Sequence, residues 1–102
     1  MATSKIPYNA DVNNFVVSVE TANVTSDATY GSIYKALSYK KPSYNMVAAI
    51  CIPQNGGYYT TFHQVVDNGA ARFYLKDAST GATVKGKTID CTFISFYQKP
   101  SA

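Results

Sequence analysis

Residues 88–97, TIDCTFISFY, form the longest run of strand-forming residues in the chain and contain no glycine or proline. Successive side chains of a strand point to opposite sides. One side would carry Ile89, Cys91, Phe93 and Ser95, and the other Thr92, Ile94 and Phe96. Neither side is wholly polar, which predicts a central strand covered on both faces. Because this strand comes last, the earlier strands must leave a place for it. The pattern therefore favours an all-β fold, a small antiparallel β-sandwich or jelly-roll-like head domain.

The preceding sequence supplies the other strands of one domain of 102 residues. We expect residues 1–12 to be an irregular N-terminal arm and residues 13–102 to be a single β domain. Strands are predicted at 15–20, 30–37, 44–53, 58–66, 71–77 and 82–85, with loops or turns at 21–29, 38–43 and 55–57. The segment 30–37 also fits helical spacing, but its short length and its loop-like flanks favour a strand.

The clearest local prediction is a hairpin closed by Asn68-Gly69, the dipeptide typical of a two-residue type I′ turn. Such a turn would place Val66 opposite Ala71 and His63 opposite Tyr74. One face of the hairpin would then enter the core with Phe62, Val66, Phe73 and Leu75. The other face would be polar and aromatic, with Thr61, His63, Arg72, Tyr74 and Lys76. Gln64 falls among the core positions and would need a hydrogen-bond partner there.

The composition indicates an unusually neutral surface rich in tyrosine. Charged residues are 15% of the chain, below the usual ~25%, and there are nine tyrosines and no tryptophan. Tyrosine has an apolar body and a polar tip, so it suits both subunit interfaces and sites for polar ligands. The net charge of +3 comes from scattered basic residues. This pattern argues against nucleic-acid binding, which uses clustered basic side chains.

Cys51 and Cys91 are the only cysteines, and both lie in apolar strand runs. We expect two buried free thiols, although a disulfide is the alternative if the strands are paired. Two cysteines and one histidine without ligand spacing predict no metal site, and no cofactor motif occurs. No apolar run approaches the ~18 residues of a membrane helix, so we expect no membrane insertion.

The reactive residue types do not form a recognisable catalytic motif. His63 is the sole histidine, and no Gly-x-Ser-x-Gly nucleophile elbow is present. Asp67 and Asp77 flank turns, where aspartate is common for structural reasons. The sequence therefore predicts a protein that is not an enzyme.

Ligand binding by stacking on tyrosine rings is the function that these residue types still allow. Saccharides present apolar ring faces and a rim of hydroxyls, which a tyrosine flanked by polar side chains can match. The candidate ligand-binding residues are Asn55, Tyr58 and Tyr59 at the turn, and His63, Arg72 and Tyr74 on the hairpin. A subunit interface, which also favours tyrosine and arginine, is the equal alternative.

The order of these features resembles a known family. A Lys-Pro turn (YKKPS, 39–43) leads into an apolar strand (YNMVAAICIP, 44–53), and a Gly-Gly turn follows. A hairpin closed by Asp67-Asn68-Gly69, a turn (DASTGAT, 77–83) and a final aromatic strand (GKTIDCTFISFY, 86–97) complete the order. This order, over about residues 30–98, is similar to the C-terminal head domains of bacteriophage tail fibres and baseplate receptor-binding proteins.

The resemblance implies a homotrimeric head, made in the host cytoplasm and displayed on the virion, that attaches the particle to a host cell-surface glycan. Other virion proteins would bind through the N-terminal arm. The resemblance assigns no binding residue. The alternatives are a structural virion protein, such as a capsid decoration or head-fibre subunit, and a free-standing carbohydrate-binding module.

Overall fold

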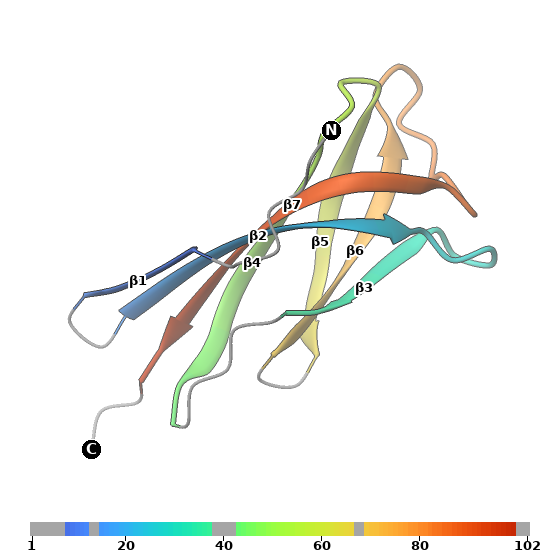
Figure 1. Ribbon diagram of the computed structural model, residues 1–102. Coiled ribbons are helices and arrows are strands. Elements are labelled where there is room, and N and C mark those ends of the chain that lie inside the picture. Colours follow the sequence, from blue (N-terminus) through green and yellow to red (C-terminus); the bar gives the residue numbers. More distant parts are fainter. Residues whose placement is uncertain (1–7, 13–14, 38–42, 67–68, 100–102) are drawn as a thin grey trace.

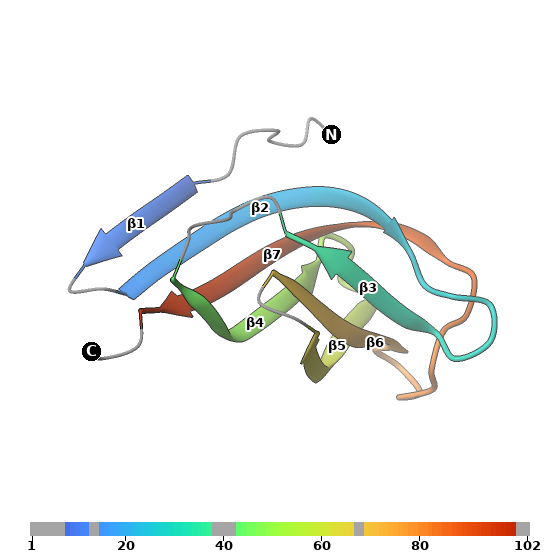
Figure 2. The same cartoon turned by 90° about the horizontal axis from the view of Figure 1, so that it is seen from below.

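The computed structural model describes residues 8–12, 15–37, 43–66 and 69–99, and these residues form seven strands and no helix. A four-stranded sheet has the order β1-β2-β7-β4, and a three-stranded sheet has the order β3-β6-β5. Figures 1 and 2 show the second sheet lying on one side of the first. All pairs are antiparallel, which confirms the predicted small β-sandwich. The strands are β1 (Tyr8–Val12), β2 (Phe15–Thr25), β3 (Ser32–Ala36), β4 (Asn45–Pro53), β5 (Tyr58–Val66), β6 (Ala70–Asp77) and β7 (Thr88–Gln98).

The last strand, β7, occupies the interior of the four-stranded sheet, as predicted. It pairs with β2 from Thr88 to Gln98 on one side and with β4 on the other. The expectation that both faces of β7 are covered is wrong for the described residues. One face is buried, whereas Ile94 and Phe96 on the other face are only partly buried. The reason is that the three-stranded sheet packs on one side of β7 alone (Figure 2).

The core lies between the two sheets. Phe93 of β7 and Phe73 of β6 are fully buried, and their ring centroids lie 5.9 Å apart. An ion pair also spans the sheets, with Lys35 Nζ 3.4 Å from Glu20 Oε2. The same ammonium lies 5.9 Å from the centroid of the Phe93 ring. The aliphatic stem of Lys35 therefore packs near the core while its charge meets a buried carboxylate.

Two segments expected to be irregular are strands. Tyr8–Val12 forms β1, which pairs with β2, and residues 1–7 of the predicted arm lie outside the described residues. Residues 21–25, expected to be a loop, continue β2, and Thr25 pairs with Thr88. These residues are small and polar, so their intrinsic strand signal is weak. The neighbouring strand supplies the backbone hydrogen bonds that extend them.

The hairpin of β5 and β6 is present, but its predicted register is wrong. Val66 pairs with Ala70, so the loop holds three residues, and a bulge at His63 then shifts the pairing again, so that Phe62 faces Phe73. Phe73 and Leu75 are buried as predicted. Phe62 is 52% exposed, and Val66, opposite Ala70, is not on the core side. Gln64 pairs with Arg72 on the outer side and is exposed, so it needs no buried partner.

The remaining strand predictions have mixed outcomes. Residues 30–37 and 44–53 contain β3 and β4 as predicted, whereas residues 82–85 contribute only an isolated bridge between Lys76 and Thr83. The predicted turn at 38–43 lies outside the described residues except for Ser43. Cys51 and Cys91 are free and buried, as expected. Hydrogen bonding to Cys91 and burial raise the pKa of the Cys51 thiol, so Cys51 stays protonated.

Candidate functional site

The turn between β4 and β5 forms one wall of a surface pocket. The Asn55 side-chain oxygen accepts a hydrogen bond from the Gly57 amide at 2.9 Å, and the Tyr58 amide donates to the Asn55 carbonyl at 3.2 Å. Asparagine commonly closes turns in this way. Because its oxygen is used inside the turn, the Asn55 side-chain NH₂ is the group that can donate to a ligand.

The opposite wall begins where β6 ends, at Asp77. Its Oδ1 accepts hydrogen bonds from the Ser79 amide (2.8 Å), the Ser79 hydroxyl (2.7 Å) and the Thr80 amide (3.2 Å). The bond from the Ser79 side chain, followed by those from the two amides, lowers the pKa of Asp77, so the carboxylate is ionised at neutral pH. Among the described residues these bonds all end on Oδ1, and Oδ2 is therefore the oxygen that can accept from a ligand.

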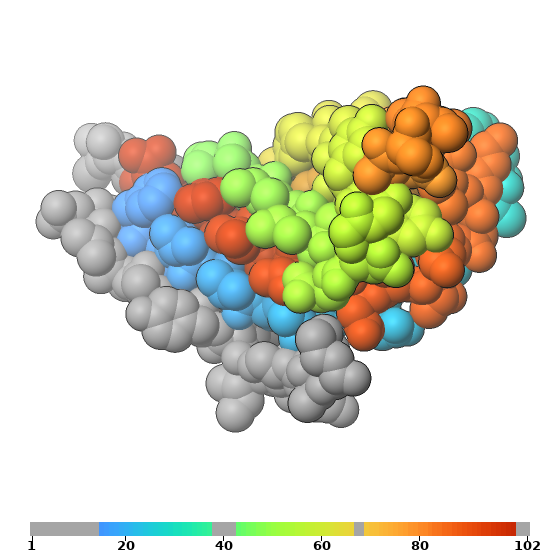
Figure 3. Space-filling view, turned by 90° about the horizontal axis from the view of Figure 1, so that it is seen from above, coloured from blue at the N-terminus to red at the C-terminus, as the bar shows by residue number. Residues whose placement is uncertain are grey.

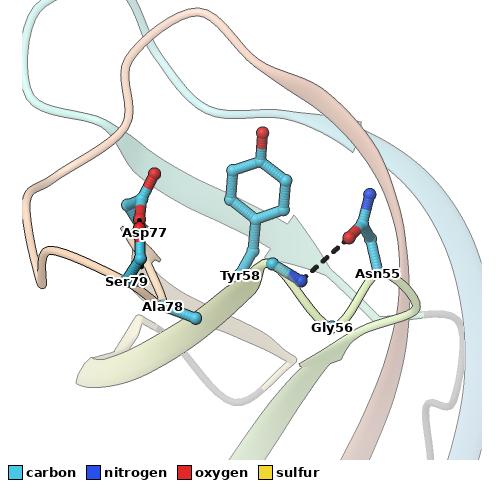
Figure 4. Close-up of a pocket in the computed structure, with 7 residues that line it drawn as sticks. Asn55, Gly56, Tyr58, Asp77, Ala78 and Ser79 are labelled. Atoms are coloured by element: carbon cyan, nitrogen blue, oxygen red, sulfur yellow. Dashed lines mark hydrogen bonds between the residues drawn. The ribbon is translucent and has the colours of Figure 1, made fainter.

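The two walls are fixed to each other. The Ala78 amide donates to the Gly57 carbonyl at 2.9 Å, and Tyr58 is the register partner of Asp77 across the hairpin. Together the two turns line an open surface pocket of about 530 Å³. Its lining consists of Asn55, Gly56, Gly57, Tyr58, Asp77, Ala78 and Ser79. Figure 4 shows the Tyr58 ring standing between the side chains of Asn55 and Asp77.

The pocket combines an aromatic ring with one amide donor and one carboxylate acceptor. The Lys87 ammonium lies 5.6 Å from the Tyr58 ring centroid and adds a cation beside the ring. The volume is in the range of small-molecule sites, which run from about 300 to 1,000 Å³. Asp77 and Lys87 carry opposite charges near the Tyr58 ring, so the site suits a polyhydroxylated ligand without net charge.

The second group of predicted residues lies elsewhere, on the outer side of the three-stranded sheet. We call this surface the outer tyrosine face. It carries Tyr34, Tyr59, His63, Arg72, Tyr74 and Lys76. The His63 and Tyr74 rings are 5.1 Å apart, and the Arg72 guanidinium lies 5.5 Å from the Tyr34 ring centroid. His63 and Tyr74 are therefore neighbours as predicted, although the bulge, and not a direct pairing, brings them together.

Sequence reasoning grouped Tyr58 with Tyr59, and the structure separates them. Tyr58 faces Asp77 in the pocket, whereas Tyr59 is opposite Lys76 on the outer tyrosine face. The pocket residues that the sequence prediction missed are Asp77 and Ser79. The sequence DAS, residues 77–79, is a typical aspartate turn, but only the hairpin register shows that it faces Tyr58.

Comparisons with known proteins do not assign the chain to a family. No family model, no curated protein and no solved structure matches the chain. Within the described ranges, no group of three or more histidine, cysteine, aspartate or glutamate side chains could hold a metal ion. The described part of the chain also contains no helix with the length and apolarity to span a membrane.

Proposed function

We propose that the chain is a non-enzymatic attachment domain of a virion that binds a neutral saccharide of a bacterial cell surface. The observation that carries this proposal is the pocket in which the Tyr58 ring stands between the Asn55 amide and the Asp77 carboxylate. The order of turns and strands that resembles phage head domains supports the virion context. A neutral saccharide fits better than a charged one because the ionised Asp77 and the Lys87 ammonium near the Tyr58 ring have opposite charges.

Both stacking and hydrogen bonding contribute to saccharide binding at this site. The apolar face of a sugar ring packs on the Tyr58 ring, and sugar hydroxyls donate to Asp77 Oδ2 and accept from the Asn55 amide. The two turns are already joined by the bond between Ala78 and Gly57, so the walls need no rearrangement on binding. Such preorganisation favours affinity because little conformational freedom is lost.

The test uses an array of bacterial surface saccharides, with host cells as a second target. Tyr58→Ala should weaken binding by ~1–3 kcal/mol, the range for stacking of bases on aromatic side chains. Asp77→Asn should also weaken binding. The turn should keep its shape, because the side-chain oxygen of asparagine can still accept the hydrogen bonds from Ser79 and Thr80. Tyr74→Ala, on the outer tyrosine face, is the matched control and should bind normally.

Other outcomes would contradict the proposal. If Tyr74→Ala lost binding and Tyr58→Ala did not, the saccharide would occupy the outer tyrosine face. If the wild-type chain bound neither the array nor host cells, the adhesion function would be refuted.

The pH dependence of binding gives an independent check. The lowered pKa of Asp77 keeps its carboxylate ionised throughout the neutral range. Affinity should therefore be constant between about pH 5 and 8 and should fall only as the pH drops below the ordinary aspartate pKa of about 3.9. In Asp77→Asn this acid-induced loss should disappear. A loss of affinity between pH 7 and 5 in the wild type would contradict the assigned role of Asp77.

A structural virion role is the second candidate, and the outer tyrosine face favours it. Tyrosine and arginine are enriched in protein interfaces, and Tyr34 is half exposed beside Arg72. In that case Tyr34→Ala and Tyr74→Ala should reduce incorporation of the chain into particles without changing saccharide binding. The position of the chain on the particle, at a tail tip or on the capsid, separates the two candidates.

A further inference from the structure

The outer side of the four-stranded sheet carries a continuous apolar surface. We call it the outer apolar face. Its members lie on the three adjacent strands β2, β7 and β4 and are Phe15, Val17, Val19, Ala48, Ile50, Ile52, Ile94 and Phe96. Register places them in rows across the strands. Val19, Ile94 and Ile50 form one complete row, and Val17, Phe96 and Ala48 form the next.

This face is exposed to an extent that is unusual for large apolar side chains. Ile50 is 46% exposed, Ile52 is 44% exposed and Phe15 is 38% exposed. The Phe15 and Phe96 rings are 6.1 Å apart, so the aromatic end of the face is continuous with the aliphatic rows. Figure 3 shows atoms of β2, β7 and β4 side by side at the visible surface. Contiguous apolar patches of this kind mark interaction sites.

We infer that a second copy of this chain covers the outer apolar face, with the two four-stranded sheets packed face to face about a two-fold axis. The first argument is charge. The eight members of the face include no charged side chain. In a two-fold interface the same patch meets itself, so any charge near the axis would oppose a like charge. A charge-free apolar face satisfies this condition.

The second argument is area. Three strands ~4.8 Å apart and rows spanning about six residues give a strip of roughly 15 Å by 20 Å. Two such strips cover roughly 600 Å² in projection, and their protruding side chains and rims would raise the buried accessible area toward about 1,000 Å², the lower limit for a specific interface. Interfaces of this size are typical of weak, transient association, so we expect a dimer that forms reversibly at micromolar concentrations. Two sheets also pack well at ~10 Å separation when both inner faces are apolar.

Other occupants match this face less well. A saccharide needs hydrogen-bonding groups, and the two complete rows offer only hydrocarbon side chains. Residues 1–7 carry two large apolar side chains, Met1 and Ile6, which are too few to cover eight apolar positions. In a three-fold assembly the contacts are heterologous, so the face would have to meet a different patch of a neighbour and not itself.

The test is sedimentation of the full chain over a concentration range from about 1 to 500 µM, which covers weak, transient dimers. The wild type should pass from monomer to dimer. Ile50→Glu should remain monomeric, and Ile50→Thr, which keeps strand propensity, should weaken the dimer at least tenfold. The matched control is Tyr34→Glu, at a side chain of similar exposure on the opposite sheet, and it should dimerise normally. Circular dichroism verifies that each variant is folded.

Four outcomes would overturn the inference. These are a wild type that stays monomeric throughout, a trimer, a dimer that Ile50→Glu leaves intact, and a chain that dimerises only after residues 2–7 are deleted. Binding of the monomer to phosphatidylcholine vesicles that is lost in Ile50→Glu would assign the face to lipid instead. Tyr58→Ala should leave dimerisation unchanged, so failure of the saccharide proposal and failure of this one are distinguishable.

Discussion

The substitution Phe93→Ala tests the central position of β7 and the packing between the two sheets. Phe93 is fully buried, lies between Glu20 of β2 and Cys51 of β4 in register, and packs against the ring of Phe73. Removing the ring loses the transfer free energy of its buried carbons and leaves a cavity. Phenylalanine-to-alanine changes in cores cost about 3–5 kcal/mol on these grounds.

We expect Phe93→Ala to cost at least the upper end of this range, about 5 kcal/mol. A side-chain cavity of roughly 100 Å³ alone costs about 2.4 kcal/mol at ~24 cal/mol per Å³. The lost transfer term adds a comparable amount, and the aromatic contact with Phe73 adds about 0.5–1.5 kcal/mol. A domain of this size has a total stability of about 5–15 kcal/mol, so the variant should be close to unfolding.

The assay is urea unfolding followed by circular dichroism and tyrosine fluorescence, since the chain has no tryptophan. Phe62→Ala is the matched control because it deletes the same atoms at a residue that is 52% exposed. It should cost about half as much or less, since half of the ring already faces water. If Phe93→Ala is too unstable to measure, Phe93→Leu should still cost more than Phe62→Leu. A loss below ~1 kcal/mol for Phe93→Ala, or equal losses for the two alanine variants, would refute the assigned packing.

Three further predictions concern other parts of the fold. In urea unfolding, Gly31→Ala should destabilise the protein by at least about 2 kcal/mol. Gly31 has a φ of 71°, and an added Cβ would collide with Thr83 and the Val84 carbonyl. The control Gly56→Ala should be nearly neutral, because no atom lies near an added Cβ there. Glu20→Leu should cost about 2–4 kcal/mol, because it leaves Lys35, whose side chain is mostly buried, without the opposing carboxylate. Adding Lys35→Met should recover most of the loss, and no recovery would contradict the ion pair. Both cysteines should resist a thiol reagent in the native protein and react fully in denaturant, and rapid labelling of the native chain would contradict their burial.

The sequence determined the strand content and most strand positions. The runs at 44–53, 58–66 and 88–97 have strand-forming side chains bounded by turn residues, and each became a strand within one residue of the predicted ends at Asn45–Pro53, Tyr58–Val66 and Thr88–Gln98. Local propensity and alternation are properties of the chain itself, so they can be recognised without a partner. The burial of both cysteines followed from the same apolar pattern.

The tertiary structure decided which residues share a face in the hairpin. A three-residue loop and a bulge at His63 change the register by one residue and then by another, and each change moves side chains to the other face. The sequence Asp67-Asn68-Gly69 is compatible with loops of two or three residues. Pairing energies along the whole hairpin select between them, and those energies depend on both strands together.

The candidate pocket also needed the folded chain, because its two halves are separated in sequence. Asn55 and Tyr58 were identified from their turn, but Asp77 looked like an ordinary turn residue until the register placed it opposite Tyr58. The outer apolar face could likewise be recognised only from the folded chain. Alternation showed that Ile94 and Phe96 share a side of β7, and only the packing of the second sheet decided that the described core would leave this side partly exposed. Side-chain alternation is a local property, whereas the choice of which face to bury depends on where every other strand lies.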